Sequence, residues 1–181
     1  MPIFTDPFIV FPSCLGLGLL LFGAALHKLR QPDAFVHVLL SYDIFPVSLV
    51  PILKRLVPLS ELLFAMALFI KATHQLAALL IAGLLVVYAA MMALTLSRGK
   101  FIADCGCSLG SAKNQVSAML IWRNLVLAVI SLNLAQPFAA RPLGYYDIVA
   151  TALLTLLGCT FYGLTNHLIG THLSSQDLFH D

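Results

Sequence analysis

The stretch HQLAALLIAGLLVVYAAMMALTL, residues 74–96, decides the class of fold, because it is long, apolar and free of Asp, Glu, Lys and Arg. A helix needs about 20 mostly apolar residues to cross the hydrocarbon core of a bilayer. This stretch reaches that length without interruption, and so predicts a membrane-spanning helix. The sequence contains no ten-residue runs of alternating apolar and polar side chains, which the strands of a membrane barrel require. We therefore expect an all-α integral membrane bundle.

The composition of the whole chain agrees with this expectation. The protein has 181 residues, of which 60% are hydrophobic and 10% are charged, and its mean hydropathy is +0.96. A water-soluble domain carries about 25% charged residues. The net charge of +2 is too small to indicate a nucleic-acid partner. The length and the absence of a low-complexity linker predict a single membrane domain over residues 1–181.

Four further apolar stretches predict spans in addition to residues 74–96. Backbone polar groups inside lipid must be hydrogen-bonded within the protein, so each of these stretches is expected to be helical. The resulting expectation is a bundle of about five transmembrane helices. The additional spans are expected at residues 8–29, 58–72, 116–135 and 144–170.

The connection over residues 31–57 differs from the spans, because it mixes apolar residues with acids, bases and three prolines. Pro32 is expected to open a short helix, and Pro46 to end or kink it. Such a mixed segment favours an amphipathic stretch that lies along the membrane interface rather than across it.

The distribution of basic residues predicts a side for each loop. If five spans alternate, the first and third loops share one side of the membrane. These loops hold seven basic residues (Lys28, Arg30, Lys54, Arg55, Arg98, Lys100 and Lys113), whereas the other side holds Lys71 and Arg141. The positive-inside rule then predicts that the first and third loops face the cytoplasm.

Ionisable residues within apolar spans are costly and mark functional or structural sites. Glu61, Arg123 and Lys28 are all expected at one membrane depth, and Asn124 adjoins Arg123. One interpretation is an ion pair between Glu61 and Arg123 that holds two helices together. The other is a buried polar pocket of these four residues that receives a partner peptide or the head group of a quinone. Both interpretations stay open at this point.

The segment FIADCGCSLGSAK, residues 101–113, places Cys105 and Cys107 one residue apart in the third loop. This spacing is near the upper limit for a disulfide, and Gly106 permits the backbone turn that closes it. A disulfide in so small a ring is labile. Flanking bases favour the thiolate, whereas Asp104 opposes it. The pattern favours a redox pair, and it does not indicate a metal site, because a closed zinc site needs four ligands.

Several motifs in order resemble the MauE family of methylamine utilisation proteins, which are polytopic membrane proteins related to DoxX-type proteins. The resemblance covers about residues 15–135 and leaves the span at 144–170 as an addition. Family members often read Cys-Gly-Cys-Phe-Gly, whereas Ser108 and Leu109 precede Gly110 here. The motifs are FGAALHKLRQPDAF at 22–35, PLSE at 58–61, RGKFIADCGCSLG at 98–110 and RN at 123–124.

This resemblance implies a multi-pass protein of the bacterial inner membrane that assists maturation of the disulfide-rich small subunit of methylamine dehydrogenase. It also implies a thioredoxin-like partner of the MauD type, so that the chain would be a thiol–disulfide oxidoreductase component, with or without turnover of its own. A periplasmic client conflicts with the cytoplasmic side that the charges predict, and the side therefore stays open. The alternatives are a non-redox scaffold or translocation partner, and a small-molecule transporter. Quinone is the single cofactor that the sequence leads us to consider.

Overall fold

The computed structural model describes residues 6–98, 118–137 and 144–177, and over these residues it contains helices and no strand. The helices therefore confirm the expected all-α class. Their bounds are α1 Pro7–Arg30, α2 Pro32–Ser41, the short 3-10 helix η2 Val47–Leu49, α3 Val50–Ala67, α4 His74–Ser97, α5 Ala118–Leu134 and α6 Tyr145–Asp177.

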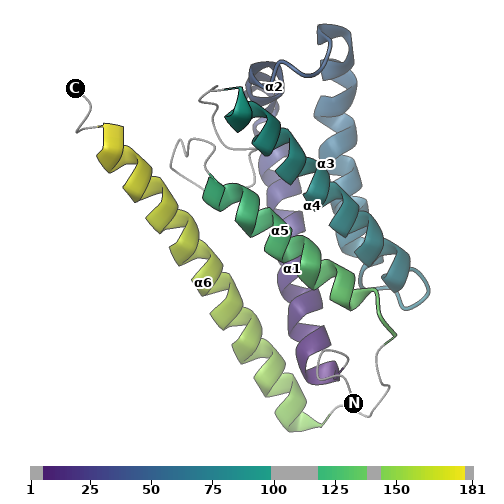
Figure 1. Ribbon diagram of the computed structural model, residues 1–181. Coiled ribbons are helices and arrows are strands. Elements are labelled where there is room, and N and C mark those ends of the chain that lie inside the picture. Colours follow the sequence, from purple (N-terminus) through teal and green to yellow (C-terminus); the bar gives the residue numbers. More distant parts are fainter. Residues whose placement is uncertain (1–5, 99–117, 138–143, 178–181) are drawn as a thin grey trace.

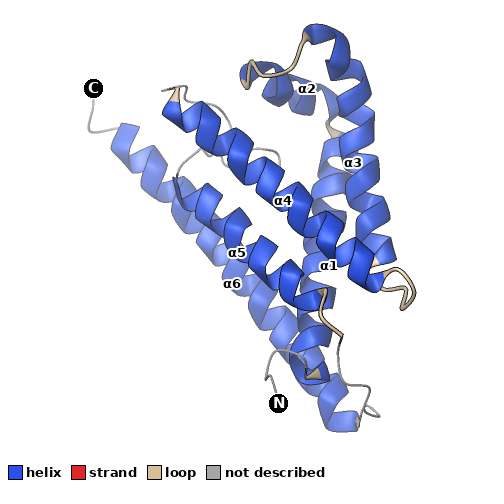
Figure 2. Ribbon diagram, turned by 45° about the vertical axis from the view of Figure 1, so that its right-hand side comes forward, coloured by secondary structure: helices blue, strands red, loops and turns tan. Residues whose placement is uncertain are grey.

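The five long helices α1, α3, α4, α5 and α6 run alternately up and down the bundle, and α2 lies at one end of it (Figure 1, Figure 2). Three helical segments in the described part of the chain are long and apolar enough to cross a membrane: Phe8–Arg30, His74–Ser97 and Tyr145–Thr165. Helix α5 is apolar but shorter, with 17 residues. Helix α3 has 18 residues and carries the charges of Lys54, Arg55 and Glu61.

The second long helix begins earlier than the sequence indicated. We expected it to start at Pro58, but α3 starts at Val50 and continues through Pro58, whose side chain is buried. The interfacial connection is correspondingly shorter and consists of α2, opened by Pro32 at its first turn, and η2, which follows Pro46. Helix interiors in membrane proteins tolerate proline, because neighbouring helices and local adjustments compensate for the lost hydrogen bond.

The core of the bundle lies between α4 and the helices around it. Helix α4 buries one face at the three-to-four-residue spacing of an amphipathic helix, and this face includes the small residues Ala77, Ala78, Ala82 and Ala89. Small side chains allow close approach of helices inside a membrane. Helices α4 and α5 form the largest contact between described helices, where the hydroxyl of Ser131 donates to the carbonyl of Ala78 at 2.7 Å.

His74 ties three helices together at the opposite end of the bundle from α2. Its Nδ1 lies 2.8 Å from the carbonyl of Leu68, which follows α3, and its Nε2 lies 3.0 Å from the carbonyl of Leu134, the last residue of α5. The side chain is buried, with 7% exposure. It contacts carbonyl groups near helix C-termini, which have no partner within their own helices.

Helix α6 is the least enclosed of the long helices. It packs mainly against α1 and diverges from the other helices toward its C-terminal end (Figure 1). Only 6% of the most apolar stretch of this helix is buried inside the bundle. Its outer faces carry large apolar side chains such as Leu153, Leu157 and Leu164. An apolar surface of this extent is suited to contact with lipid tails.

Candidate functional site

A buried ion pair joins α1 to α3. The ammonium group of Lys28 lies 2.5 Å from Oε1 of Glu61, and the two side chains have relative exposures of 1% and 0%. Buried charges of this kind are costly unless they are paired and hydrogen-bonded. The pair therefore fixes the positions of the two helices relative to each other.

Two aromatic rings complete this cluster of Lys28, Glu61, Tyr88 and Phe35, which we term the ion-pair cluster. The Tyr88 hydroxyl donates to Oε1 of Glu61 at 2.6 Å, which brings α4 to the pair. The Lys28 ammonium lies 5.0 Å from the centre of the Tyr88 ring and 5.4 Å from that of Phe35 in α2. These are cation–π distances. Four helices thus converge on one lysine.

Sequence reasoning did not identify Tyr88 and Phe35 as part of the site. A signal for Tyr88 was present, because it is the one tyrosine within the uncharged stretch at 74–96. A tyrosine hydroxyl in an apolar environment needs a hydrogen-bond partner, and the carboxylate of Glu61 provides it. Phe35 ends the motif at residues 22–35 that carries the family resemblance, but nothing in that motif indicated a contact with Lys28.

The expected ion pair between Glu61 and Arg123 is wrong. Glu61 pairs with Lys28, whereas the guanidinium carbon of Arg123 lies 5.5 Å from the centre of the Tyr162 ring in α6. Asn124 is buried on a different face of α5, with its Nδ2 4.0 Å from the sulfur of Met92 in α4. Lys28 and Glu61 thus lie together, Arg123 lies against α6, and Asn124 contacts α4.

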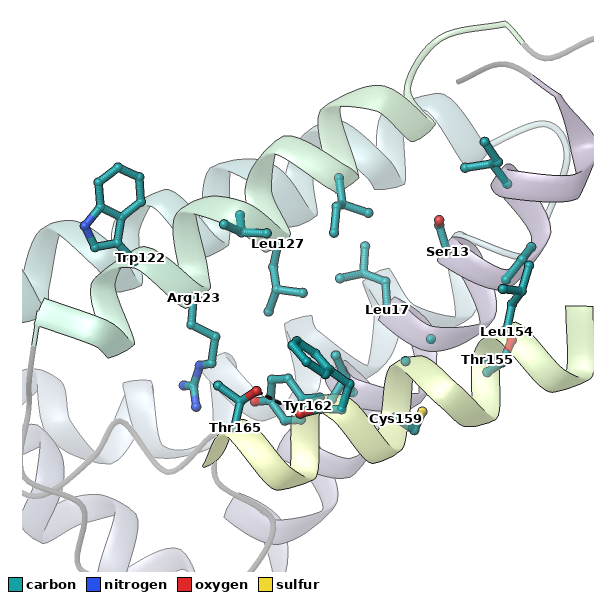
Figure 3. Close-up of a pocket in the computed structure, with 18 of the residues that line it drawn as sticks. Ser13, Leu17, Trp122, Arg123, Leu127, Leu154, Thr155, Cys159, Tyr162 and Thr165 are labelled. Carbon is teal, nitrogen blue, oxygen red and sulfur yellow. Dashed lines mark hydrogen bonds between the residues drawn. The ribbon is translucent and has the colours of Figure 1, made fainter. Parts of the chain in front are cut away.

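The helical geometry of α5 explains this separation. Successive residues of an α-helix point about 100° apart around the axis, since there are 3.6 residues per turn. Asn124 consequently faces α4, whereas Arg123 faces the side where α6 lies (Figure 3). Adjacency in the sequence placed these two residues at one depth but on different faces.

The redox segment, with Asp104, Cys105, Gly106 and Cys107, lies outside the described residues. The helices on either side of it end at Ser97 and begin at Ala118. Tyr88 lies roughly two and a half turns before the end of α4, and Asn124 lies less than about two turns after the start of α5. The ion-pair cluster is thus near the end of the bundle from which the Cys-Gly-Cys segment extends.

The described part of the chain contains two further cysteines, which lie in α1 and α6. Cys14 is a free thiol buried in α1, and Cys159 is a free, half-buried thiol in α6. Among residues 6–98, 118–137 and 144–177, no group of three or more His, Cys, Asp or Glu side chains is placed to hold a metal ion.

The buried position of Lys28 also changes the charge count between the two sides of the membrane. Its charge is neutralised inside the bundle by Glu61, so it is not a loop charge. Lys54 is partly compensated as well, because its Nζ lies 3.7 Å from the carboxylate of Asp33. The excess of basic residues that predicted a cytoplasmic third loop is therefore smaller than the sequence suggested.

Apolar helices that surround a buried ion pair, with a Cys-Gly-Cys segment between α4 and α5, define a helical membrane protein with a candidate thiol site at one end. The family described as "Methylamine utilisation protein MauE" matches residues 6–137. This match covers more than half of the sequence, and the chain belongs to that family. It therefore has a role in methylamine utilisation.

Individual relatives carry the same description. The chain is 31% identical to "Methylamine utilization protein MauE" of Paracoccus denitrificans over 171 residues, which cover 94% of this chain and 92% of the relative. It is 33% identical to the protein so named from Methylophilus methylotrophus, over 84% of this chain and 79% of that one. The corresponding protein of Methylorubrum extorquens is 32% identical, with 87% of each chain covered. No solved structure matches the chain.

Proposed function

We propose that this protein assists the maturation of the small subunit of methylamine dehydrogenase as a multi-pass protein of the bacterial inner membrane. Cys105 and Cys107 exchange disulfides with a thioredoxin-like partner of the MauD type. Membership of a methylamine utilisation family supports the pathway. The observation that carries the chemistry is the pair of thiols one residue apart, in the connection between two helices that pack tightly together.

The exchange is chemically balanced. A thiolate of the reduced pair attacks one sulfur of the other protein's disulfide, and a mixed disulfide forms as the second sulfur leaves as a thiolate. The remaining thiol of the attacking pair then resolves the mixed disulfide. One pair gains a disulfide and the other becomes a dithiol, so two electrons and two protons pass between them and the number of disulfides is unchanged.

The bundle supports this chemistry by giving the thiol segment a fixed frame. The ion-pair cluster holds α1, α2, α3 and α4 together at the end of the bundle from which the segment extends. The bond from Ser131 to Ala78 holds α5 against α4 farther along. The segment that carries the two thiols therefore begins and ends on helices that pack against each other.

The proposal is tested by trapping the intermediate in a methylamine-using bacterium whose own family gene is replaced by this one. Cys107→Ser or Cys105→Ser removes the resolving thiol, so a mixed disulfide with the partner should accumulate and should vanish on reduction. The double variant should leave the protein in the membrane but greatly reduce correctly paired small subunit. Cys159→Ser, which alters a thiol within α6, is the matched control and should have no effect.

Normal maturation of the small subunit in the double variant would refute thiol exchange and favour a non-redox scaffold. The side of the membrane is tested with the same strains. A membrane-impermeant maleimide should label Cys105 or Cys107 in intact cells if the pair meets a periplasmic client directly. Labelling that requires permeabilised cells would contradict direct contact with that client.

A further inference from the structure

An elongated cavity lies between α1, α5 and α6 (Figure 3). Its volume is about 760 Å³. Its walls are almost entirely apolar, with side chains such as Leu17, Leu127 and Leu154 directed toward it. A cavity of this size is large enough for a bound molecule and too apolar to be a favourable site for water.

The extent of the lining shows that the cavity is a slot along the helices. Its lining residues lie between Phe8 and Leu20 of α1, between Met119 and Ile130 of α5, and between Leu154 and Thr165 of α6. At a rise of 1.5 Å per residue, each helix lines roughly 16–18 Å of the cavity. This shape fits an extended hydrocarbon chain better than a compact metabolite.

One end of the slot carries a positive charge. Arg123 is the single charged residue among the lining residues, and it lies over the ring of Tyr162, close to Thr165 (Figure 3). A cation at membrane depth is stabilised by an anion placed beside it.

The neighbour of Arg123 indicates the depth of this end. Trp122 is 68% exposed on the outer surface of α5. Tryptophan is enriched where the hydrocarbon core meets the lipid head groups. Arg123 is therefore at the level at which the phosphates of the bilayer lie within reach of a long arginine side chain.

We propose that this slot is a binding site for one anionic phospholipid, with an acyl chain along the apolar walls and the phosphate at Arg123. A guanidinium group offers paired N–H donors that match two phosphate oxygens. The exposed apolar surface of α6 places the slot beside the bilayer, from which a lipid can enter laterally. The lipid holds α6 in place against α1 and α5, and this inference does not depend on the thiol chemistry.

The head-group contact is tested by native mass spectrometry of the purified full-length protein with added phosphatidylglycerol or phosphatidylcholine. We expect one phosphatidylglycerol per chain and preference over phosphatidylcholine by roughly tenfold, the size of one or two charge-assisted hydrogen bonds. Arg123→Gln should abolish the preference, and Arg123→Lys should retain part of it. Arg55→Gln, which removes an exposed arginine on α3, should leave the preference unchanged.

The contact between the lipid acyl chain and the slot is tested by substitutions at two glycines of α6. A Cβ at Gly158, which lines the slot, or at Gly163, which does not, would meet no atom within 4 Å. Gly158→Leu should therefore fill the slot without a clash and reduce retention of both lipids by roughly tenfold, as expected for excluding a buried hydrocarbon chain. Gly163→Leu is the matched control and should retain both lipids like the unaltered protein.

Two results would overturn the proposal. Equal retention of both lipids by the unaltered protein and by Arg123→Gln would show that Arg123 does not bind a phosphate. Displacement of phosphatidylglycerol by an equimolar amount of ubiquinone, or self-association that Gly158→Leu abolishes, would assign the slot to a quinone or to a helix of a second copy. Circular dichroism of every variant distinguishes loss of the lipid site from loss of the fold, because an unchanged helical signal is required for a variant to count.

Discussion

The ion-pair cluster and the slot beside α6 solve the same physical problem in different ways. Each region places a cation inside an apolar bundle, Lys28 in the first and Arg123 in the second. Lys28 has its counter-charge within the chain, at Glu61, and is surrounded by four helices. Arg123 stands on the wall of a cavity of about 760 Å³ whose other lining residues are uncharged.

The difference separates a region that is filled by the chain's own side chains from one that has room for another molecule. In the ion-pair cluster the chain supplies the counter-charge of Lys28 and the side chains packed around it, so substitutions there should act on stability. In the slot, added side chains meet open space, so substitutions there should act on what is bound. The predictions below test this division.

The largest effect on stability is expected from breaking the ion pair. Glu61→Gln leaves the buried ammonium of Lys28 without its carboxylate and should lower the free energy of unfolding by about 3–5 kcal/mol. Thermal unfolding in detergent measures this. The double variant with Lys28→Met should recover much of the loss, because it removes both buried charges together.

The control for this prediction is Asp33→Asn, which breaks the surface pair with Lys54. Asp33 is 91% exposed, so this substitution should leave the unfolding temperature almost unchanged. Equal losses from Glu61→Gln and Asp33→Asn would show that the ion-pair cluster is not the closed region described here.

An intermediate effect is expected from leucines introduced at two glycines, one packed against Phe69 and one that lines the slot. A Cβ at Gly18 would lie 2.7 Å from the ring of Phe69, whereas one at Gly158 would meet nothing within 4 Å. Gly18→Leu should therefore destabilise the bundle by about 1–3 kcal/mol through overpacking. Gly158→Leu should be neutral or stabilising by up to about 1 kcal/mol, because leucine favours a helix more than glycine does.

Comparison of the two unfolding temperatures checks this prediction directly, since both substitutions add the same side chain to an apolar helix. A larger loss from Gly158→Leu than from Gly18→Leu would mean that the slot is closed in solution.

The smallest effect is expected at the contact between α4 and α5, which separates the two regions. Ser131→Ala removes the bond to the Ala78 carbonyl, and hydrogen bonds between helices in membranes contribute on average about 0.6 kcal/mol. The control is Ser97→Ala, because the exposed Ser97 hydroxyl bonds a carbonyl of its own helix. A loss above that of Gly18→Leu would indicate that α5 depends on this single bond.

The prolines show one limit of prediction from sequence. A short helix was expected to begin at Pro32, and the second span at Pro58. Pro58 is an interior residue of α3, since burial against neighbouring helices compensates for its missing N–H. The expectation at Pro32 is confirmed, because α2 does begin there.

The amino-acid sequence by itself determined the class of the protein and the approximate position of every long helix. Apolar stretches of membrane length can satisfy their backbone hydrogen bonds within one segment, so their structure does not depend on the rest of the chain. The sequence also marked Lys28, Glu61, Arg123 and Asn124 as unusual, since polar groups in apolar helices are costly wherever the helices pack.

Only the tertiary structure decided which of these residues meet. Depth in the membrane follows from position along a helix, but the direction of a side chain depends on how that helix is rotated against its neighbours. Lys28 and Arg123 were both expected at the depth of Glu61. Helix packing directed Lys28 toward Glu61 and Arg123 toward α6. The slot has the same origin, because it exists where α6 packs on α1 and diverges from α5, which no local pattern in the sequence specifies.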